Sequence, residues 1–331
     1  MEDLKLGIIG TNFVSDWLCD AVKETDGIEN SAVYSRTHEK GSEFAAKHGI
    51  GCIYTDMDEF LCSDIDAVYI ASPNKFHYEY AMKAVKAGKH VLLEKPATLT
   101  RDEFMSLTKS AREKGVVVLE AMRPVHDPAL EMIREAIPKI GTLRRAVFDF
   151  CQYSSRYDRF KKGEILNAFT PSLGNAAVMD IGVYAVEVCV ALFGMPKDIF
   201  ARSVKLSNGF EGMGSVFFDY GDFQAEVVYS KITDSFNPSV ITGEDGYISI
   251  GKLSMMEYAD VKMRNGSEEK LFRDRFSGSS ANMVYEVGDF VKAVRGELDV
   301  KKYHEYTEGT LKIIDEIRNL FRSVFLSHLL S

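Results

Sequence analysis

The first third of the chain alternates between short apolar runs and segments in which apolar residues recur at helical spacing. Leu4–Ile9 is an apolar run of the kind that a buried parallel strand needs, and Phe13–Lys23 then follows the helical period. The alternation continues with strands predicted at 31–34, 67–71, 90–93 and 116–119, and with helices predicted at 38–47, 76–87 and 101–114. Strands alternating with helices in this way predict a parallel, doubly wound sheet.

The pattern changes after Met122 and becomes rich in strands. Strands are predicted at 143–150, 199–206, 214–220 and 223–229, the last two joined by a Gly221-Asp222 hairpin turn. One helix, Ala176–Leu192, lies among them, and helices at 282–295 and 305–325 close the chain. A length of 331 residues suits two domains. We therefore predict a dinucleotide-binding Rossmann domain at 1–122 and an α/β domain for substrate binding and oligomerisation at 123–331.

Charge and composition narrow the range of partners and compartments. The formal net charge is -9, which makes nucleic acid and anionic membranes poor partners. The acidic N-terminus does not resemble a signal peptide, and no uninterrupted apolar stretch has the length of a membrane span. Neither HExxH nor paired cysteines signal a metal site, and the five cysteines are interpreted as reduced core thiols. We predict a cytoplasmic protein without a bound metal.

The turn after the first strand predicts where a dinucleotide would bind. A fingerprint turn needs glycine where the backbone approaches a pyrophosphate at a helix N-terminus. Only Gly10 matches strictly, while Asn12 and Ser15 replace the other two glycines; asparagine tolerates a positive φ, so the turn survives. The predicted contacts are Gly10, Thr11, Asn12 and Phe13. A tight turn without any ligand would explain the same residues.

Two further strand ends extend this cofactor site. Ser35 and Arg36 follow the second strand, where an NAD-preferring protein places a carboxylate, and a guanidinium with a hydroxyl suits a 2′-phosphate. NADP is therefore the expected cofactor, with NAD possible; a solvated arginine is the alternative. Small and polar residues after the fourth strand fit a ligand in the crevice, although the start of a helix explains them nearly as well. They are Ala71, Ser72, Pro73, Asn74 and His77.

The segment Ala87-Gly88-Lys89-His90-Val91-Leu92-Leu93-Glu94-Lys95-Pro96 closely resembles the signature of the Gfo/Idh/MocA family of oxidoreductases. Three further segments agree in order: Glu120–Arg123, Met179–Tyr184 and Gly243–Gly246. The resemblance covers nearly the whole chain. It implies a Rossmann domain followed by a domain with a large, open, mostly antiparallel sheet, one face of which commonly forms a dimer or tetramer interface. It also implies NAD(P), with Glu94, Lys95 and Arg123 near the cofactor, and a sugar, polyol or diol substrate.

The sequence departs from the family pattern at Asn12 and at Tyr184, where most members carry histidine. The tyrosine form resembles the branch of dimeric dihydrodiol dehydrogenases and NADP-dependent xylose dehydrogenases. Hydride transfer to a carbonyl needs a proton donor at the developing alkoxide. We assign this role to Tyr184, oxyanion stabilisation to Lys95 and orientation to Asp180, which lies four residues before Tyr184 on a predicted helix.

Each assignment has a structural alternative. Lys95 could be a surface lysine, Asp180 a charge on a helix face, Tyr184 a packing residue, and Arg123 and Arg156 solvated salt-bridge partners. The run from Tyr153 to Tyr157 is a candidate lining of the substrate pocket. For the whole protein, the alternatives to a dehydrogenase are a non-catalytic, cofactor-binding regulator and a hydrolase that uses the cofactor transiently. Retention of Lys95, Asp180 and Tyr184 favours the enzyme, because a regulator needs no proton relay.

Overall fold

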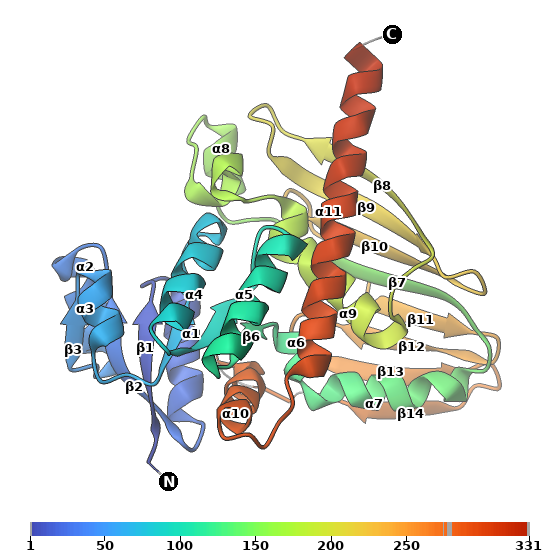
Figure 1. The fold of residues 1–331 in the computed structure, drawn as a ribbon. Helices are drawn as coiled ribbons and strands as arrows, with labels where there is room; N and C mark the ends of the chain where they lie inside the picture. The colour runs from blue at the N-terminus through green and yellow to red at the C-terminus, as the bar shows by residue number, and fades with distance from the viewer. Residues whose placement is uncertain (1, 274, 277–279, 330–331) are drawn as a thin grey trace. The chain divides into compact units, whose positions relative to one another are not determined.

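The structure is a computed structural model that describes residues 2–273, 275–276 and 280–329 (Figure 1). The chain forms two compact units. The first holds the chain up to His126 and a later segment that carries α10 (Met283–Val294) and ends at Glu305; the second begins at Asp127. The predicted division at residue 123 lies near the first boundary. It treated each domain as continuous, however, and the return of α10 to the first unit was not foreseen.

The first unit is built on a six-stranded parallel sheet in the order β3-β2-β1-β4-β5-β6. This order reverses direction between β1 and β4, as in a doubly wound fold, which confirms the predicted fold class. β4 is buried along its whole length, as a central parallel strand should be. The strands are β1 (Leu4–Ile9), β2 (Ile28–Tyr34), β3 (Cys52–Tyr54), β4 (Ala67–Ile70), β5 (His90–Glu94) and β6 (Val118–Ala121).

Helices cover this sheet on both faces. α1 packs against α10, and α4 against α5. Right-handed crossovers place these two pairs on opposite faces, because the strand order runs outward in opposite directions from β1 and β4. The helices are α1 (Phe13–Lys23), α2 (His38–His48), α3 (Met57–Cys62), α4 (His77–Lys86), α5 (Arg101–Lys114) and α6 (Arg123–His126), with the short η1 (Asn74–Phe76) before α4.

The start of α5 shows how local sequence sets these boundaries. The hydroxyl of Thr100 accepts a hydrogen bond from the Glu103 backbone N–H at 3.3 Å, and the Glu103 carboxylate accepts one from the Leu99 backbone at 3.0 Å. These reciprocal bonds satisfy amides that have no partner inside the helix. Thr100 thus caps α5 while Glu103 reaches back to the amide of the residue before the cap, and α5 begins at the predicted residue.

The second unit contains an eight-stranded sheet in the order β14-β13-β12-β11-β7-β10-β9-β8. β7 and β10 pair in parallel and the remaining neighbours are antiparallel, which confirms the predicted mostly antiparallel sheet. The strands are β7 (Leu143–Cys151), β8 (Asp198–Lys205), β9 (Glu211–Asp219), β10 (Gln224–Ser230), β11 (Ser239–Gly243), β12 (Gly246–Gly251), β13 (Tyr258–Met263) and β14 (Glu268–Phe272).

One face of the sheet is covered by the apolar helix α9 (Val183–Phe193), which packs on β7 and β10. The other helices in this part of the chain are α7 (Pro128–Ala136), α8 (Tyr157–Lys161) and α11 (Lys301–Leu329), with short helical turns at 137–140, 167–169 and 171–173. The segment Pro171–Phe193 is long and apolar enough to cross a membrane. However, 72% of its most apolar window is buried, as in the core helix of a globular protein.

Two sequence predictions need correction. The single helix expected from Ala176 to Leu192 instead begins with a π-helical turn, Val178–Gly182, before α9. The five cysteines are free thiols, but Cys52 and Cys62 are exposed rather than in the core. Cys52 opens the short strand β3, which lies at the edge of the sheet, and Cys62 is the last residue of α3.

Candidate active site

The carboxyl edge of the first sheet is tied together where the strand order reverses. Gly10, at the end of β1, has φ +110°, and a Cβ there would lie 2.6 Å from the carbonyl oxygen of Ala71 at the end of β4. The side chain of Asn12 donates a hydrogen bond to the same oxygen at 2.8 Å. Only glycine allows this close approach of two backbones. Gly10 therefore allows the tight strand-to-helix turn that the first glycine of a dinucleotide fingerprint provides.

Asn12 acts through its side chain and not through its backbone. Its φ of -98° is extended, so the positive φ expected at this position is wrong. Its side-chain oxygen instead accepts from the backbone N–H groups of Val14 at 2.8 Å and Ser15 at 3.3 Å, capping α1. Next to it, Phe13 is 47% exposed and touches Trp17 edge to face. Asn12 thereby replaces the glycine of the fingerprint with a helix cap.

His77 joins the ends of β4 and β5. The residue is buried, and its ring nitrogens lie 2.8 Å from the carbonyl oxygens of Pro96 and Ser72. Burial lowers the pKa of His77, against the two carbonyls, which favour the charged ring. Both ring nitrogens of His77 face backbone carbonyls. His77 can therefore affect cofactor binding only indirectly, by positioning the segments after β4 and β5.

Lys95 follows β5 at this edge and is half-buried, with a cis peptide bond to Pro96. Glu94 is buried beneath it and accepts a hydrogen bond from the hydroxyl of Tyr69 at 2.6 Å. Burial raises the pKa of Glu94, while the charge of Lys95, the Tyr69 hydroxyl and Arg123 oppose this rise. Glu94 is therefore a buried carboxyl that is engaged by Tyr69, with Lys95 as an opposite charge near it.

Two more carboxyls lie behind the same edge. The first is Glu120, which accepts a hydrogen bond from the Ala97 backbone N–H at 2.7 Å. Nearby in the chain, the guanidinium of Arg123 donates to the side-chain oxygen of Asn282 at 2.7 Å. Glu286 on α10 is fully buried, and neither of its carboxyl oxygens has a hydrogen-bond partner. Burial, with the nearby charge of Glu94, raises the pKa of Glu286 well above its usual range. Burial without a hydrogen-bond partner favours the neutral form of Glu286, an arrangement that no sequence pattern indicated.

Ser35 and Arg36 lie where predicted, after β2. Ser35 is buried, and its backbone N–H donates to Tyr54 of the neighbouring strand at 3.0 Å. Arg36 is exposed, and its charge acts on Tyr80 of α4, whose pKa is raised by burial and lowered by the guanidinium. A cation and no carboxylate follow this strand, which fits a dinucleotide with an anionic 2′ substituent.

Asp180 and Tyr184 belong to the second unit, on the π-helical turn and α9. The ring of Tyr184 meets Phe150 edge to face, with centroids 5.6 Å apart. Asp180, 40% exposed, forms an ion pair with Lys231, whose side chain is only 7% exposed and lies over the ring of Phe169. Lys231 was not predicted, because it lies 51 residues beyond Asp180 with no motif around it. π-Helical turns occur often at functional sites.

Glu211 holds the start of this helix. Its carboxylate accepts a hydrogen bond from the Val178 backbone N–H at 2.9 Å. Burial raises the pKa of Glu211 to about 7, and the bond from Val178 moderates the rise. Gly182 leaves room for the buried ring of Tyr229, since a Cβ there would lie 3.0 Å from it. A carboxyl that titrates near neutrality therefore lies under the turn that carries Asp180.

The run from Tyr153 to Tyr157 adjoins the same region. The Tyr153 hydroxyl donates to Asp158 at 2.7 Å, and its ring meets that of Tyr157 at 5.4 Å. Tyr157 in turn stacks on Phe169 at 5.7 Å, which is the ring that lies under Lys231. This aromatic group connects the predicted lining residues with Asp180. The predicted site residues thus fall into two groups, one in each unit.

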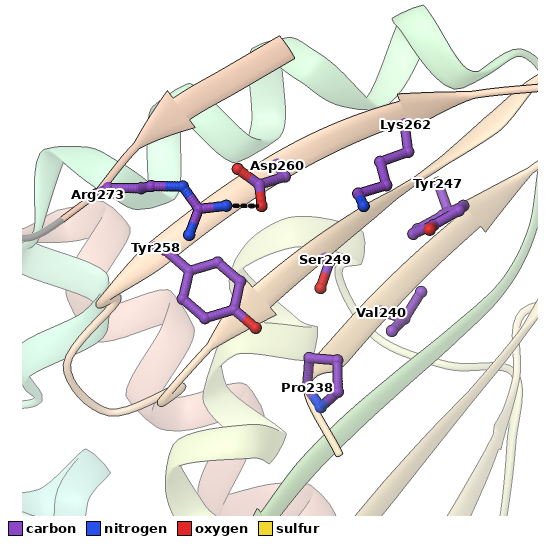
Figure 2. Close-up of a pocket in the computed structure, with 8 residues that line it drawn as sticks. All are labelled: Pro238, Val240, Tyr247, Ser249, Tyr258, Asp260, Lys262 and Arg273. Carbon is purple, nitrogen blue, oxygen red and sulfur yellow. Dashed lines mark hydrogen bonds and ion pairs between the residues drawn. The ribbon is translucent and has the colours of Figure 1, made fainter. Parts of the chain in front are cut away.

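A separate pocket lies on the second sheet and contains none of the predicted site residues (Figure 2). In Figure 2 the ring of Tyr258 lies beside Arg273, which forms an ion pair with Asp260. The remaining residues that line the pocket come mainly from β11, β12 and β13. They are Pro238, Val240, Tyr247, Ser249 and Lys262. Across the described residues, His, Cys, Asp and Glu side chains form no group of three that could hold a metal ion.

Comparisons with known proteins show which family and which fold the chain resembles. A family model described as "Oxidoreductase family, NAD-binding Rossmann fold" matches residues 4–122. The scyllo-inositol 2-dehydrogenase (NADP(+)) of Bacillus subtilis (strain 168) is 39% identical over 97% of this chain and 98% of that protein. The trans-1,2-dihydrobenzene-1,2-diol dehydrogenase of Xenopus laevis is 27% identical over 80% of each. The 3-ketoreductase KijD10 of Actinomadura kijaniata, solved with NADP and TDP-benzene, shares the fold at a TM-score of 0.85 and 20% identity, over 96% of this chain and 98% of that one.

Proposed function

Because this chain belongs to the Gfo/Idh/MocA family and is an NAD(P)-dependent oxidoreductase acting on CH–OH groups, we propose that it transfers hydride between NADP and a sugar, polyol or trans-diol. One observation carries the cofactor half of the proposal: Gly10 and Asn12 tie the end of β1 to Ala71, leaving a glycine turn at the reversal of the strand order. The exposed cation of Arg36 after β2 supports NADP over NAD.

The substrate half rests on three side chains. NADP supplies the hydride acceptor or donor. The ammonium of Lys95 hydrogen-bonds the substrate oxygen and stabilises the negative charge that develops on it. The hydroxyl of Tyr184 takes or gives the proton at that oxygen, and Asp180 orients the reacting hydroxyl. The names of the inositol and dihydrodiol dehydrogenases support a substrate with adjacent hydroxyl groups.

The test is a spectrophotometric assay of the purified protein with NADP+ or NAD+ and scyllo-inositol, myo-inositol, D-xylose or a trans-dihydrodiol. On the best substrate, Lys95→Met and Tyr184→Phe should each lower kcat by about a hundred-fold or more. Tyr184→His should retain more activity than Tyr184→Phe. Its pH optimum should lie below that of the unmutated protein, because the pKa of imidazole is about 6.5.

Matched controls are Lys139→Met and Tyr247→Phe, which change an exposed lysine and an exposed tyrosine of the second unit and should leave kcat unchanged. A Tyr184→Phe enzyme with the kcat of the unmutated protein would remove the assignment of Tyr184. Tight binding of NADP(H) without turnover of any substrate would instead favour the non-catalytic regulator.

A further inference from the structure

We propose that Lys231 is a positioning residue for this reaction, whose buried ammonium fixes the carboxylate of Asp180 on the turn before Tyr184. The inference deepens the proposed function and rests on it, because Asp180 matters only if it orients the substrate. Lys231 itself is not assigned any contact with substrate or cofactor.

Lys231 is buried in a way that lysine rarely is. Its side chain is 7% exposed, and its ammonium contacts the Asp180 carboxylate and lies 5.6 Å from the centroid of the Phe169 ring. Lysine is almost never fully buried unless it is paired, and an aromatic face stabilises a desolvated cation. The ammonium is therefore held between one carboxylate and one ring.

The backbone that carries this side chain is fixed on both sides. The Lys231 N–H donates to Gly212 of β9 at 2.9 Å, and its carbonyl accepts from Ser154 at 2.9 Å. The preceding Ser230 hydroxyl accepts from the backbone of Ile232 and Thr233 at 3.1 and 2.9 Å. The cation thus projects from a hydrogen-bonded strand end and not from a loose loop.

Asp180 is the more exposed partner of the pair. Its side chain is 40% exposed, and its backbone N–H bonds to Ala176 at 3.1 Å within the irregular start of the helix. A partly buried ion pair adds little stability, because desolvation of the ions offsets their attraction, and apolar replacements are often as stable. Stability alone therefore does not account for a buried lysine here, whereas orientation of a half-exposed carboxylate does.

Titratable side chains that pack against this turn include Glu211 of β9 and Tyr229 of β10, and Tyr184 follows the turn on α9. Of these, Glu211 has a pKa of about 7, raised by burial, so it also titrates in the range of an enzyme assay. The pH profiles are therefore compared in the unmutated protein and in a Glu211→Gln background.

The test compares Lys231→Met, which keeps length and burial but removes the charge, with Lys231→Arg, which keeps the charge. With scyllo-inositol and NADP+, or the best substrate of the panel, Lys231→Met should lower kcat by about tenfold or more. The KM for NADP+ should not change. The acidic limb of the pH profile should move to higher pH, because a carboxylate that loses its cation is protonated more readily. Lys231→Arg should recover most of the activity.

The double variant Lys231→Met/Asp180→Asn separates coupling from instability. If Lys231 acts through Asp180, the double variant should be no slower than Asp180→Asn alone. The proposal would be overturned if the double variant lost kcat by the product of the two single losses. It would also be overturned if Lys231→Met and Lys231→Arg lowered kcat equally at every pH. Lys139→Met, which breaks an exposed ion pair with Glu269, is the matched control.

A measurement without turnover keeps the two proposals apart. In a crystal structure of Lys231→Met, the Asp180 carboxylate should leave the position it has in the unmutated protein. An unchanged Asp180 in a folded variant would contradict the role of Lys231 whatever the substrate is. Lack of turnover by the unmutated protein would count only against the proposed function.

Discussion

Arg36 is the exposed residue with the clearest expected effect on cofactor choice. It follows buried Ser35 at the end of β2, where no carboxylate is present to bind a ribose 2′-hydroxyl. A charge-assisted contact to a 2′-phosphate contributes about 1.5–3 kcal/mol, or roughly ten- to a hundred-fold in affinity. We therefore expect NADP(H) to bind more tightly than NAD(H), and Arg36→Ala to weaken NADP(H) by this factor while leaving NAD(H) nearly unchanged.

Titration of both cofactors by nicotinamide fluorescence measures these affinities. Arg144→Ala is the matched control, because Arg144 is an exposed arginine of the second unit that pairs with Glu244. Equal affinities of the unmutated protein for NADPH and NADH would contradict the role of Arg36.

Asn12 shows what sequence alone can and cannot predict about a residue. That Asn12 lies in the turn after β1 was predicted correctly, because the turn follows a strand whose limits the apolar pattern marks. Its conformation was not, because the bonds that fix it include one to Ala71, which lies 59 residues away. Lys231 and Glu286 were missed for the same reason. Their burial depends on partners from distant strands and helices, and an isolated Lys or Glu usually predicts a solvated side chain.

Among the elements, the helix with the π-helical turn should respond most clearly to pH. Glu211, whose carboxylate bonds to Val178 at its start, has a pKa raised from 4.5 to about 7. The folded state keeps this proton between these values while the unfolded state loses it. The contribution of Glu211 to the free energy of unfolding is therefore fully present below about pH 4.5. It is lost as the pH rises to about 7, by roughly 3 kcal/mol in total.

The side chain of the Glu211→Gln variant cannot ionise, so the variant should not lose this part of the free energy of unfolding as the pH rises. We expect the free energy of unfolding, measured in urea at pH 5 and pH 8, to fall less between these values in the variant than in the unmutated protein. The control Glu244→Gln removes an exposed carboxyl and should keep the full pH dependence. The same pH dependence in Glu211→Gln and the unmutated protein would show that another group carries it.

Elements were predicted best where the signal is local. β1, α1 and α5 have the predicted limits, because their apolar period and caps lie within a few residues of one another. The strands β11 to β14 were not predicted as strands, although the segment Gly243–Gly246, which connects β11 and β12, had been singled out by the family resemblance. β14 is mostly exposed, so its strand identity comes from pairing with β13 and not from an apolar pattern. The residues of the π-helical turn Val178–Gly182 carry no sequence signal that separates a π-helix from the α-helix expected there.

At the scale of the whole molecule, we expect self-association through the open face of the second sheet. The apolar side chains of Val216, Phe218, Val227 and Tyr229 on this sheet are buried, so they offer no free apolar surface. The side chains of Phe200, Val204 and Tyr247 do offer one, because they are 58%, 50% and 39% exposed. Phe200 pairs with Phe217 across β8 and β9, and exposed apolar groups of this kind mark interfaces.

Light scattering at micromolar concentration should give a mass of at least twice 37.1 kDa. Phe200→Glu should shift the protein toward the monomer, because a charge cannot be buried there without cost. Lys139→Glu places a carboxylate at an exposed polar residue of the second unit outside the sheet strands and is the control. A monomeric unmutated protein would contradict the expectation.

The return of α10 to the first unit has a consequence for biosynthesis. A ribosome adds about 5–20 residues per second, so the strands up to Ala121 emerge well before Val294 has been joined to the chain. In that interval, the side of α1 that later packs against α10 has no partner from that helix, although it carries apolar side chains. The part of the protein that is made first is thus among the last to be completed, and until α10 is made, apolar side chains of α1 lack the cover that this helix provides.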